Sequence, residues 1–345
     1  MPEGVDWPAL VALAKAQGVA ALAYDGLQKC YEADRSLVLP LDREQRQVKF
    51  DWFGAVLDVE MRCERQWKAI SELGARFNDA GLRTLVLKGF AVSGCYPEPR
   101  HRYSSDFDCF LLGPGPVADR SAYEQGNLLM EASGVKVSRF HYKHSSFKFK
   151  GVTVENHQFL TGWRGSAKWK RFELELDAML EGKELESLSA EAPLLVGPPL
   201  FNALFLTRHA HQHFLIEDGI SLRHVCDWAM FLRRYRTEFD WDEFMSICNK
   251  YGLASFASSM TRLAGYVCGV YVDDPIDLHS EDLRSLDEIL STKEHYRNDR
   301  GRFSIALRIL RSGWKFRDFS DESRIGCLLR YVLGYFFNRS PKLES

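Results

Sequence analysis

Two aspartates separated by one residue are the part of the sequence best suited to chemistry. They are Asp106 and Asp108, in the run Ser-Ser-Asp-Phe-Asp-Cys-Phe at 104–110. Alternate side chains of a β-strand share a face, so we expect both carboxylates on one side of a strand. Neighbouring carboxylates repel each other unless a cation lies between them, and magnesium often binds carboxylates together with substrate phosphates. The pattern indicates phosphoryl or nucleotidyl transfer assisted by Mg²⁺, or by Mn²⁺ in its place.

A site with two metal ions needs a third carboxylate, and Glu155 is the best candidate. It lies in the run Val-Thr-Val-Glu-Asn-His at 152–157, an apolar strand able to pair beside the first. In such a site one ion activates the attacking hydroxyl and the other steadies the leaving group. We expect Asp106 and Asp108 to hold both ions. Glu155 would then be a general base or a ligand of the ion on the nucleophile side.

A strand that ends in lysine and glycine precedes these carboxylates. Residues 85–89 read Leu-Val-Leu-Lys-Gly and lead into an expected helix. Gly89 would let the backbone approach a phosphate, and the helix N-terminus would present N–H groups. Lys88 and Arg102 would add positive charge beside a triphosphate. A structural pairing of Arg102 with Asp106 is the alternative for that arginine.

The order of these motifs resembles that of a known family. Leu-Lys-Gly at 87–89, Tyr-Pro at 96–97, Arg102 and Ser-Asp-x-Asp at 105–108 are similar to the bacterial family of uncharacterised nucleotidyltransferases. That family is a branch of the polymerase-beta-like nucleotidyltransferase superfamily. The resemblance covers the middle of the chain well, and the first helices and residues 209–227 more loosely. It implies catalytic metal ligands at Asp106, Asp108 and Glu155. It also implies nucleotide-binding residues at Lys88, Gly89, Arg102 and Ser105.

Several histidines near these motifs have more than one interpretation. On a helix His209 and His213 would share a face while His211 points elsewhere, so only two of the three could converge on zinc. Packing in the core is the favoured interpretation, with His209 as the one expected to touch the nucleotide. His157 shares a strand face with Glu155. It would orient that carboxylate, contact a phosphate, or serve as a structural histidine.

The elements that must position these residues predict an α+β fold. It would comprise a small mixed-sheet nucleotidyltransferase-like core at 81–197, flanked by helical regions at 1–80 and 198–345. Strands are expected at 84–87, 106–112, 147–150 and 152–160, the last two as a hairpin around Gly151, with a helix at 122–132. A stripe of apolar residues predicts a long first-region helix with Val56, Cys63, Trp67, Ile70 and Phe77 on its buried face. A linker at 37–42 and a turn at 273–275 complete the expectations.

Composition restricts the partners of the chain. Its 45 basic and 47 acidic residues give a net charge of −2, so nucleic acid is not a favoured partner. Eight scattered cysteines without a Cys-x-x-Cys pair predict reduced thiols and a cytoplasmic protein. We expect neither a signal peptide nor a transmembrane segment.

A local excess of positive charge lies near the C-terminus. Residues 293–342 hold 12 Lys or Arg against 5 Asp or Glu, with Trp314, Phe316 and Phe319 among them. This stretch would steer an anionic acceptor, a nucleic acid or an acidic membrane face. A solvated amphipathic helix is the preferred interpretation.

These patterns together predict a nucleotidyltransferase that uses magnesium. It would move a nucleoside monophosphate from a triphosphate such as ATP to the hydroxyl of an unknown acceptor, which is a small molecule, a sugar or a protein. One alternative is a catalytically degenerate core that binds nucleotides or acts as an assembly module. The other alternative is a metal-dependent phosphohydrolase, although the chain contains no adjacent His-Asp pair of the HD type.

Overall fold

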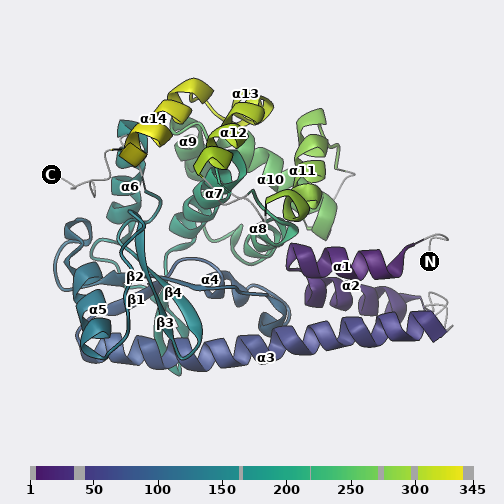
Figure 1. Cartoon of the computed structure of the whole chain (residues 1–345), viewed down its shortest axis with the longest axis horizontal. Helices are drawn as coiled ribbons and strands as arrows, with labels where there is room; N and C mark the ends of the chain where they lie inside the picture. The colour runs from purple at the N-terminus through teal and green to yellow at the C-terminus, as the bar shows by residue number, and fades with distance from the viewer. Residues whose placement is uncertain are drawn as a thin grey trace.

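The computed structural model describes residues 5–34, 43–162, 166–217, 219–270, 276–296 and 302–336 (Figure 1). The expected linker at 37–42 and turn at 273–275 lie outside these residues. The strands are β1 (Arg83–Val86), β2 (Phe107–Leu112), β3 (His144–Phe149), β4 (Val152–His157), β5 (Glu186–Ser189) and β6 (Ala192–Val196). The helices are α1 (Trp7–Gln17), α2 (Ala20–Ala33), α3 (Arg43–Asp79), α4 (Phe90–Ser93), α5 (Ser121–Ala132), α6 (Ala167–Leu180), α7 (Pro199–Leu215), α8 (Leu222–Tyr235), α9 (Trp241–Lys250), α10 (Ala254–Cys268), α11 (Ser280–Tyr296), α12 (Arg302–Arg311), α13 (Gly313–Phe319) and α14 (Arg324–Phe336).

The described strands form one mixed sheet in the order β3-β4-β2-β1-β6-β5. Strand β2 is antiparallel to β1 and parallel to β4, while β3 and β4 form the predicted hairpin. Gly151 in the turn of that hairpin has a φ of +82°, a conformation that favours glycine. The α+β fold class is therefore confirmed, whereas the division at residues 80 and 197 stays a prediction.

Alternate residues of β2 face two different cores. Cys109 and Leu111 belong to a core that also contains Ile70 and Phe77 of α3. Phe110 belongs to a second core, formed with the C-terminal helices. Because side chains alternate along a strand, Asp108 shares the face of Phe110 and points toward those helices.

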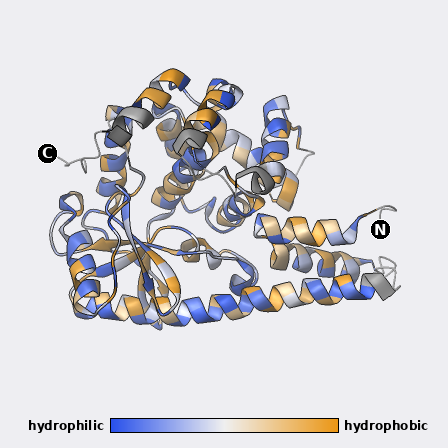
Figure 2. Ribbon diagram, viewed as in Figure 1, coloured by the Kyte–Doolittle hydropathy of each residue, from blue (hydrophilic) through white to orange (hydrophobic). Residues whose placement is uncertain are grey.

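Helix α3 runs from the first two helices to beneath the sheet (Figure 1). The predicted apolar stripe is confirmed, since Val56, Ile70 and Phe77 are buried and Cys63 and Trp67 are partly buried. Figure 2 shows hydrophobic and hydrophilic residues alternating along this helix, as expected for a helix with one buried face. None of the described helices is long and apolar enough to cross a membrane.

The element boundaries differ from the prediction in several places. The helix expected at 122–132 is α5, but β3 begins earlier than expected and β4 ends at His157 rather than at 160. Helix α6 and the strands β5 and β6 were not predicted. Every residue of β5 is at least partly exposed, and its pairing with β6 contains a register shift. The sequence therefore lacks the alternation of apolar and polar residues that would predict a strand there.

The C-terminal helices form a separate layer above the sheet in Figure 1. The rings of Trp314 and Phe319 lie 6.0 and 5.8 Å from that of Phe214. Lys315 donates to Glu288 Oε1 at 2.7 Å and to the Phe214 carbonyl at 3.2 Å. Of the aromatic residues named from the sequence, Phe316 and Phe319 are buried and Trp314 is partly buried, so these three stabilise a helical core.

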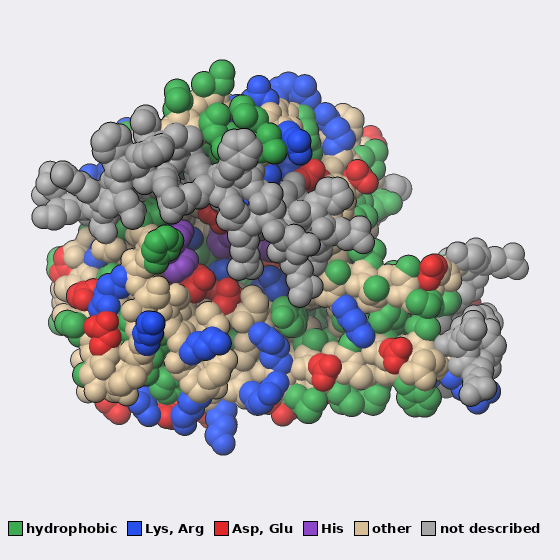
Figure 3. All heavy atoms as spheres, viewed as in Figure 1, with side chains coloured by type: hydrophobic (Ala, Val, Ile, Leu, Met, Phe, Trp, Pro, Cys, Tyr) green, Lys and Arg blue, Asp and Glu red, His purple; other side chains and the backbone are tan. Residues whose placement is uncertain are grey.

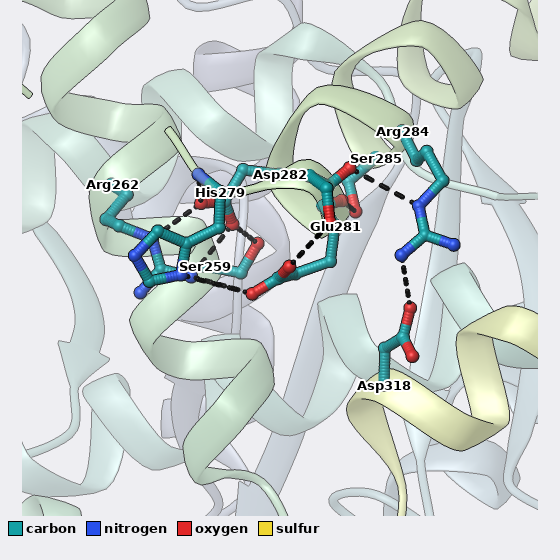
Figure 4. Close-up of polar contacts among 9 residues, drawn as sticks. Ser259, Arg262, His279, Glu281, Asp282, Arg284, Ser285 and Asp318 are labelled. Atoms are coloured by element: carbon teal, nitrogen blue, oxygen red, sulfur yellow. Dashed lines mark hydrogen bonds and ion pairs between the residues drawn. The ribbon is translucent and has the colours of Figure 1, made fainter. Parts of the chain in front are cut away.

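A buried carboxylate joins α10 to the start of α11 (Figure 4). Asp282 accepts from Ser259 Oγ at 2.5 Å, from Arg262 Nε at 2.6 Å and from the backbone N–H of His279 at 2.9 Å. Arg284 of the same helix donates to Asp318 of α13 at 2.8 Å. These contacts fix the helices behind the cavity described next.

Candidate functional site

A cavity of about 880 Å³ lies between the sheet, the C-terminal helices and α1. Lys88, Asp106 and Asp108 line it on the sheet side, and α7 and α8 line it on the other side. Ligand sites commonly measure about 300–1,000 Å³, so a nucleotide fits a space of this size. Figure 3 shows acidic, basic and histidine side chains gathered in the hollow between the two layers.

Two of the predicted carboxylates face each other across neighbouring strands. Asp108 of β2 is the register partner of Glu155 of β4 in a parallel pair. Asp108 is 2% exposed and Glu155 is partly buried. Val154, next to Glu155, lies in the core beneath the sheet, so Glu155 points to the same face as Asp108. The expected adjacency of these two strands is confirmed.

The remaining carboxylate, Asp106, lies one residue before β2, so its predicted place within the strand is wrong. The preceding backbone is held by α3: Arg62 Nε donates to the Ser104 carbonyl at 2.9 Å. Ser105 is exposed, and its hydroxyl donates to Asp106 Oδ1 at 2.9 Å. Asp106 is thereby more accessible from the cavity than Asp108.

Lys88 supplies positive charge directly beside the carboxylates. Its ammonium lies 3.1 Å from Asp108 Oδ2. Burial opposes the charge of Lys88, but Asp108, Asp106 and Glu155 outweigh burial and raise its pKa. The three carboxylates form a donor set that fits a divalent ion, because such an ion prefers oxygen ligands.

His157 supports Asp108 from the same face of β4. Its Nε2 lies 3.1 Å from Asp108 Oδ1, and its Nδ1 lies 3.2 Å from the Phe159 carbonyl. Burial would raise the pKa of Asp108, but Lys88 and His157 outweigh burial and hold that pKa below its usual value. His157 is thus placed to orient Asp108, whereas the sequence suggested this role toward Glu155, whose Oε2 lies 3.7 Å from Nε2.

Gly89 makes the bend after β1 and Lys88. Its φ is +63°, and a Cβ there would lie 3.1 Å from Arg102 Nη1, so both the backbone and the space favour glycine. The helix expected after it is the four-residue α4. This helix is shorter than the sequence predicted, so it presents less of a helix N-terminus to a phosphate.

Arg102 lines the cavity, but it is paired with an acidic residue that lies far away in the sequence. It makes two bonds to Asp227 of α8, from Nε to Oδ1 at 3.0 Å and from Nη2 to Oδ2 at 2.6 Å. Its Nη1 donates to Ser104 Oγ at 2.8 Å, and Asp227 also accepts from the Tyr96 hydroxyl at 2.7 Å. The structural pairing considered from the sequence was with Asp106, whereas the partner is Asp227.

The helical wall of the cavity carries a group of imidazoles. The ring of His209 lies 4.4 Å from that of His213 and 6.3 Å from that of His224. Burial lowers the pKa of His209 well below its ordinary value, which leaves the ring neutral. His211 points away and its Nε2 donates to the Phe319 carbonyl at 2.8 Å. The prediction that His209 and His213 share a face is confirmed.

Sequence reasoning missed several lining residues, among them Lys15 of α1 and Arg223, His224 and Asp227 of α8. Arg223 lies over the ring of Tyr103 at 5.6 Å, and its Nε has no hydrogen-bond partner among the described residues. A signal existed at α8, since Arg223, His224 and Asp227 fall one and three residues apart on a helix whose other face is apolar. Nothing in the sequence placed that helix opposite residues 88–108.

Comparisons with known proteins identify the family. A family model described as "Uncharacterised nucleotidyltransferase" matches residues 3–269. No curated protein and no solved structure matches the chain. The matched range includes α1, the sheet with its carboxylates, and the helices α7 and α8 that close the cavity. The chain therefore belongs to the family of uncharacterised nucleotidyltransferases.

Proposed function

We propose that the protein transfers a nucleoside monophosphate from a nucleoside triphosphate to an acceptor hydroxyl, with Mg²⁺ or Mn²⁺ held by Asp106, Asp108 and Glu155. The observation that carries this proposal is the pairing of Asp108, which lines the cavity, with Glu155 on the adjacent strand. The bound ions would lower the pKa of the attacking hydroxyl and neutralise the leaving pyrophosphate. Glu155, the partly exposed carboxylate, would accept the hydroxyl proton or hold the ion beside it.

The triphosphate would lie along the cationic side of the cavity. Lys88 and Arg223 line it from opposite layers, and Lys15 lines it from α1. Arg102 would act as a positioning residue, because its pair with Asp227 holds α8 in place. It would thereby set the distance between Lys88 and Arg223. Leu206, Trp228 and Met260 supply apolar surface for a nucleobase or for the acceptor.

Calorimetric titration tests the binding step. Nucleotides with a non-hydrolysable α,β bridge suit it, because the bond proposed to break joins the α-phosphorus to its bridging oxygen. We expect heat of binding that requires Mg²⁺ or Mn²⁺ and that is absent in Asp106→Asn/Asp108→Asn. An absence of heat in the wild type, or an unchanged signal in the double variant, would contradict the proposal.

Labelled nucleotides separate the proposal from its two alternatives. Transfer moves an α-phosphate label to an acceptor and releases pyrophosphate, whereas a phosphohydrolase releases phosphate and modifies no acceptor. A binding module would bind nucleotide without either product. One observation favours that alternative: both oxygens of Asp108 already have partners, in Lys88 and His157. The acceptor class and the cytoplasmic location stay predictions.

A further inference from the structure

A second group of metal-ligating side chains lies at the outer edge of the candidate site. It consists of His144 on β3 and Glu155 and His157 on β4, and one ligand atom of each lies within 4.8 Å of the others. His144 Nδ1 is 3.4 Å and His157 Nε2 is 3.7 Å from the same oxygen, Glu155 Oε2. We propose that these three residues bind a transition-metal ion of the zinc, manganese or cobalt class, whether or not a nucleotide is present.

The strand pairing brings these ligands together. His144 is the register partner of His157 in the antiparallel hairpin, and Glu155 precedes His157 by two residues on the same face. Opposite side chains on one face of an antiparallel pair have Cβ atoms about 5 Å apart, which lets two imidazoles reach one ion. The ligands therefore stand on a rigid hairpin.

His144 carries an unused ligand atom. Its Nδ1 is buried and, among the described residues, has no hydrogen-bond partner. Buried polar atoms are rarely left without a partner, and each exception calls for an explanation such as an ion. The ring of His141 stacks on that of His144 at 4.4 Å, which helps to hold its orientation. An ion beside Glu155 Oε2 would satisfy the free nitrogen.

His157 has the outer contact that metal-binding histidines usually have. Its Nδ1 lies 3.2 Å from the Phe159 carbonyl. A proton on Nδ1 donated to that carbonyl would leave Nε2 free to bind the ion, in place of the hydrogen bond that Nε2 otherwise donates to Asp108. Asp108 Oδ1, 3.1 Å from the same Nε2, would stand beside the ion.

The ligand types select the metal. Two imidazole nitrogens and one carboxylate suit zinc and its first-row neighbours, whereas Mg²⁺ favours an all-oxygen shell with several waters. This set differs from the proposed catalytic set and shares only Glu155 with it. An ion here would place positive charge next to Asp108 without occupying Asp106.

Spectroscopic titration of the full chain with Co²⁺ tests the site. We expect one equivalent of Co²⁺ to produce the visible absorption of a histidine-ligated ion, and Zn²⁺ but not Mg²⁺ to displace it. His144→Ala should weaken Co²⁺ binding at least about tenfold. His279→Ala is the matched control, because His279 is exposed and pairs with Glu281 far from the hairpin.

Two further variants keep the outcome clear. His157→Ala should also abolish Co²⁺ binding. Because His157 also contacts Asp108, its loss would disturb the candidate active site as well, so His144→Ala is the decisive variant. Asp106→Asn should lose metal-dependent nucleotide binding while it retains the Co²⁺ absorption, which separates this site from the catalytic proposal. An absorption that is absent, or unchanged in His144→Ala, would overturn the inference.

Discussion

At the scale of single residues, the buried carboxylate of Asp108 makes the central contacts of the candidate site. Asp108 is held by Lys88 on one oxygen and by His157 on the other. Motif spacing predicted that Lys88, Asp108 and Glu155 would converge, because all three lie on or next to short strands, and it left the role of His157 open. The Asp227 partner of Arg102 is 125 residues away in the chain, and Arg223 lies on the same helix as Asp227. Their places depend on helix packing, which local patterns do not encode.

Removing the charge of Lys88 should destabilise the fold as well as weaken nucleotide binding. Lys88→Met would leave Asp108 buried without its cation, a change that typically costs about 3–5 kcal/mol. Urea unfolding measures the loss in free energy. Lys250→Met is the control, because the side chain of Lys250 is exposed and the loss of its ion pair with Glu175 should change the free energy of unfolding little. Equal effects of the two substitutions would count against this account of Lys88.

At the scale of elements, the parallel pairing of β2 with β4 creates the site. The helix that covers these strands approaches them closely at Gly126 of α5, where a Cβ would lie 2.2 Å from Leu111 Cδ1. Asn127, next to it, accepts from Asn156 Nδ2 at 3.0 Å and from Ser145 Oγ at 2.6 Å. The sequence predicted α5 and these strands from their apolar patterns. It did not predict this close contact, which depends on the tertiary fit of Leu111.

We expect Gly126→Ala to lower the free energy of unfolding by about 1–3 kcal/mol, because the methyl group must displace a buried leucine. Gly26→Ala in α2 is the matched control. A Cβ there meets nothing within 4 Å, so alanine should be neutral or stabilise the helix by up to about 1 kcal/mol. Chemical denaturation of both variants decides the point, and a neutral Gly126→Ala would show that α5 does not fit the sheet closely.

At the scale of the whole molecule, three layers meet around the cavity. Gln17 of α1 donates to the Ile289 carbonyl of α11 at 2.9 Å and accepts from the backbone N–H of Leu222 of α8 at 2.9 Å. His211 joins α7 to α13 through the Phe319 carbonyl. The sequence predicted helices before and after the sheet. It contained no signal for their arrangement, because each of these contacts joins residues more than 100 positions apart.

Stability should fall in mild acid because buried imidazoles stay neutral. Burial, with a smaller contribution from Arg208, lowers the pKa of His211 to about 3. Below its ordinary pKa of about 6.5 the unfolded chain binds a proton that the folded chain does not. The stability contribution is therefore complete above about pH 6.5 and is lost as pH falls toward 3.

His211→Gln tests this linkage, since the glutamine amide can still donate to Phe319. Between about pH 7 and pH 5 the wild type should lose about 2 kcal/mol more unfolding free energy than the variant. Urea denaturation at both pH values measures the difference, and parallel losses in the two proteins would refute it.

The most direct test of the central claim is a crystal structure with Mn²⁺ and an α,β-non-hydrolysable nucleoside triphosphate. We predict anomalous scattering peaks between the triphosphate and the carboxylates of Asp106, Asp108 and Glu155, with the phosphates facing Lys88. A nucleotide bound elsewhere, or one bound in the cavity with no manganese peak at these carboxylates, would contradict the account.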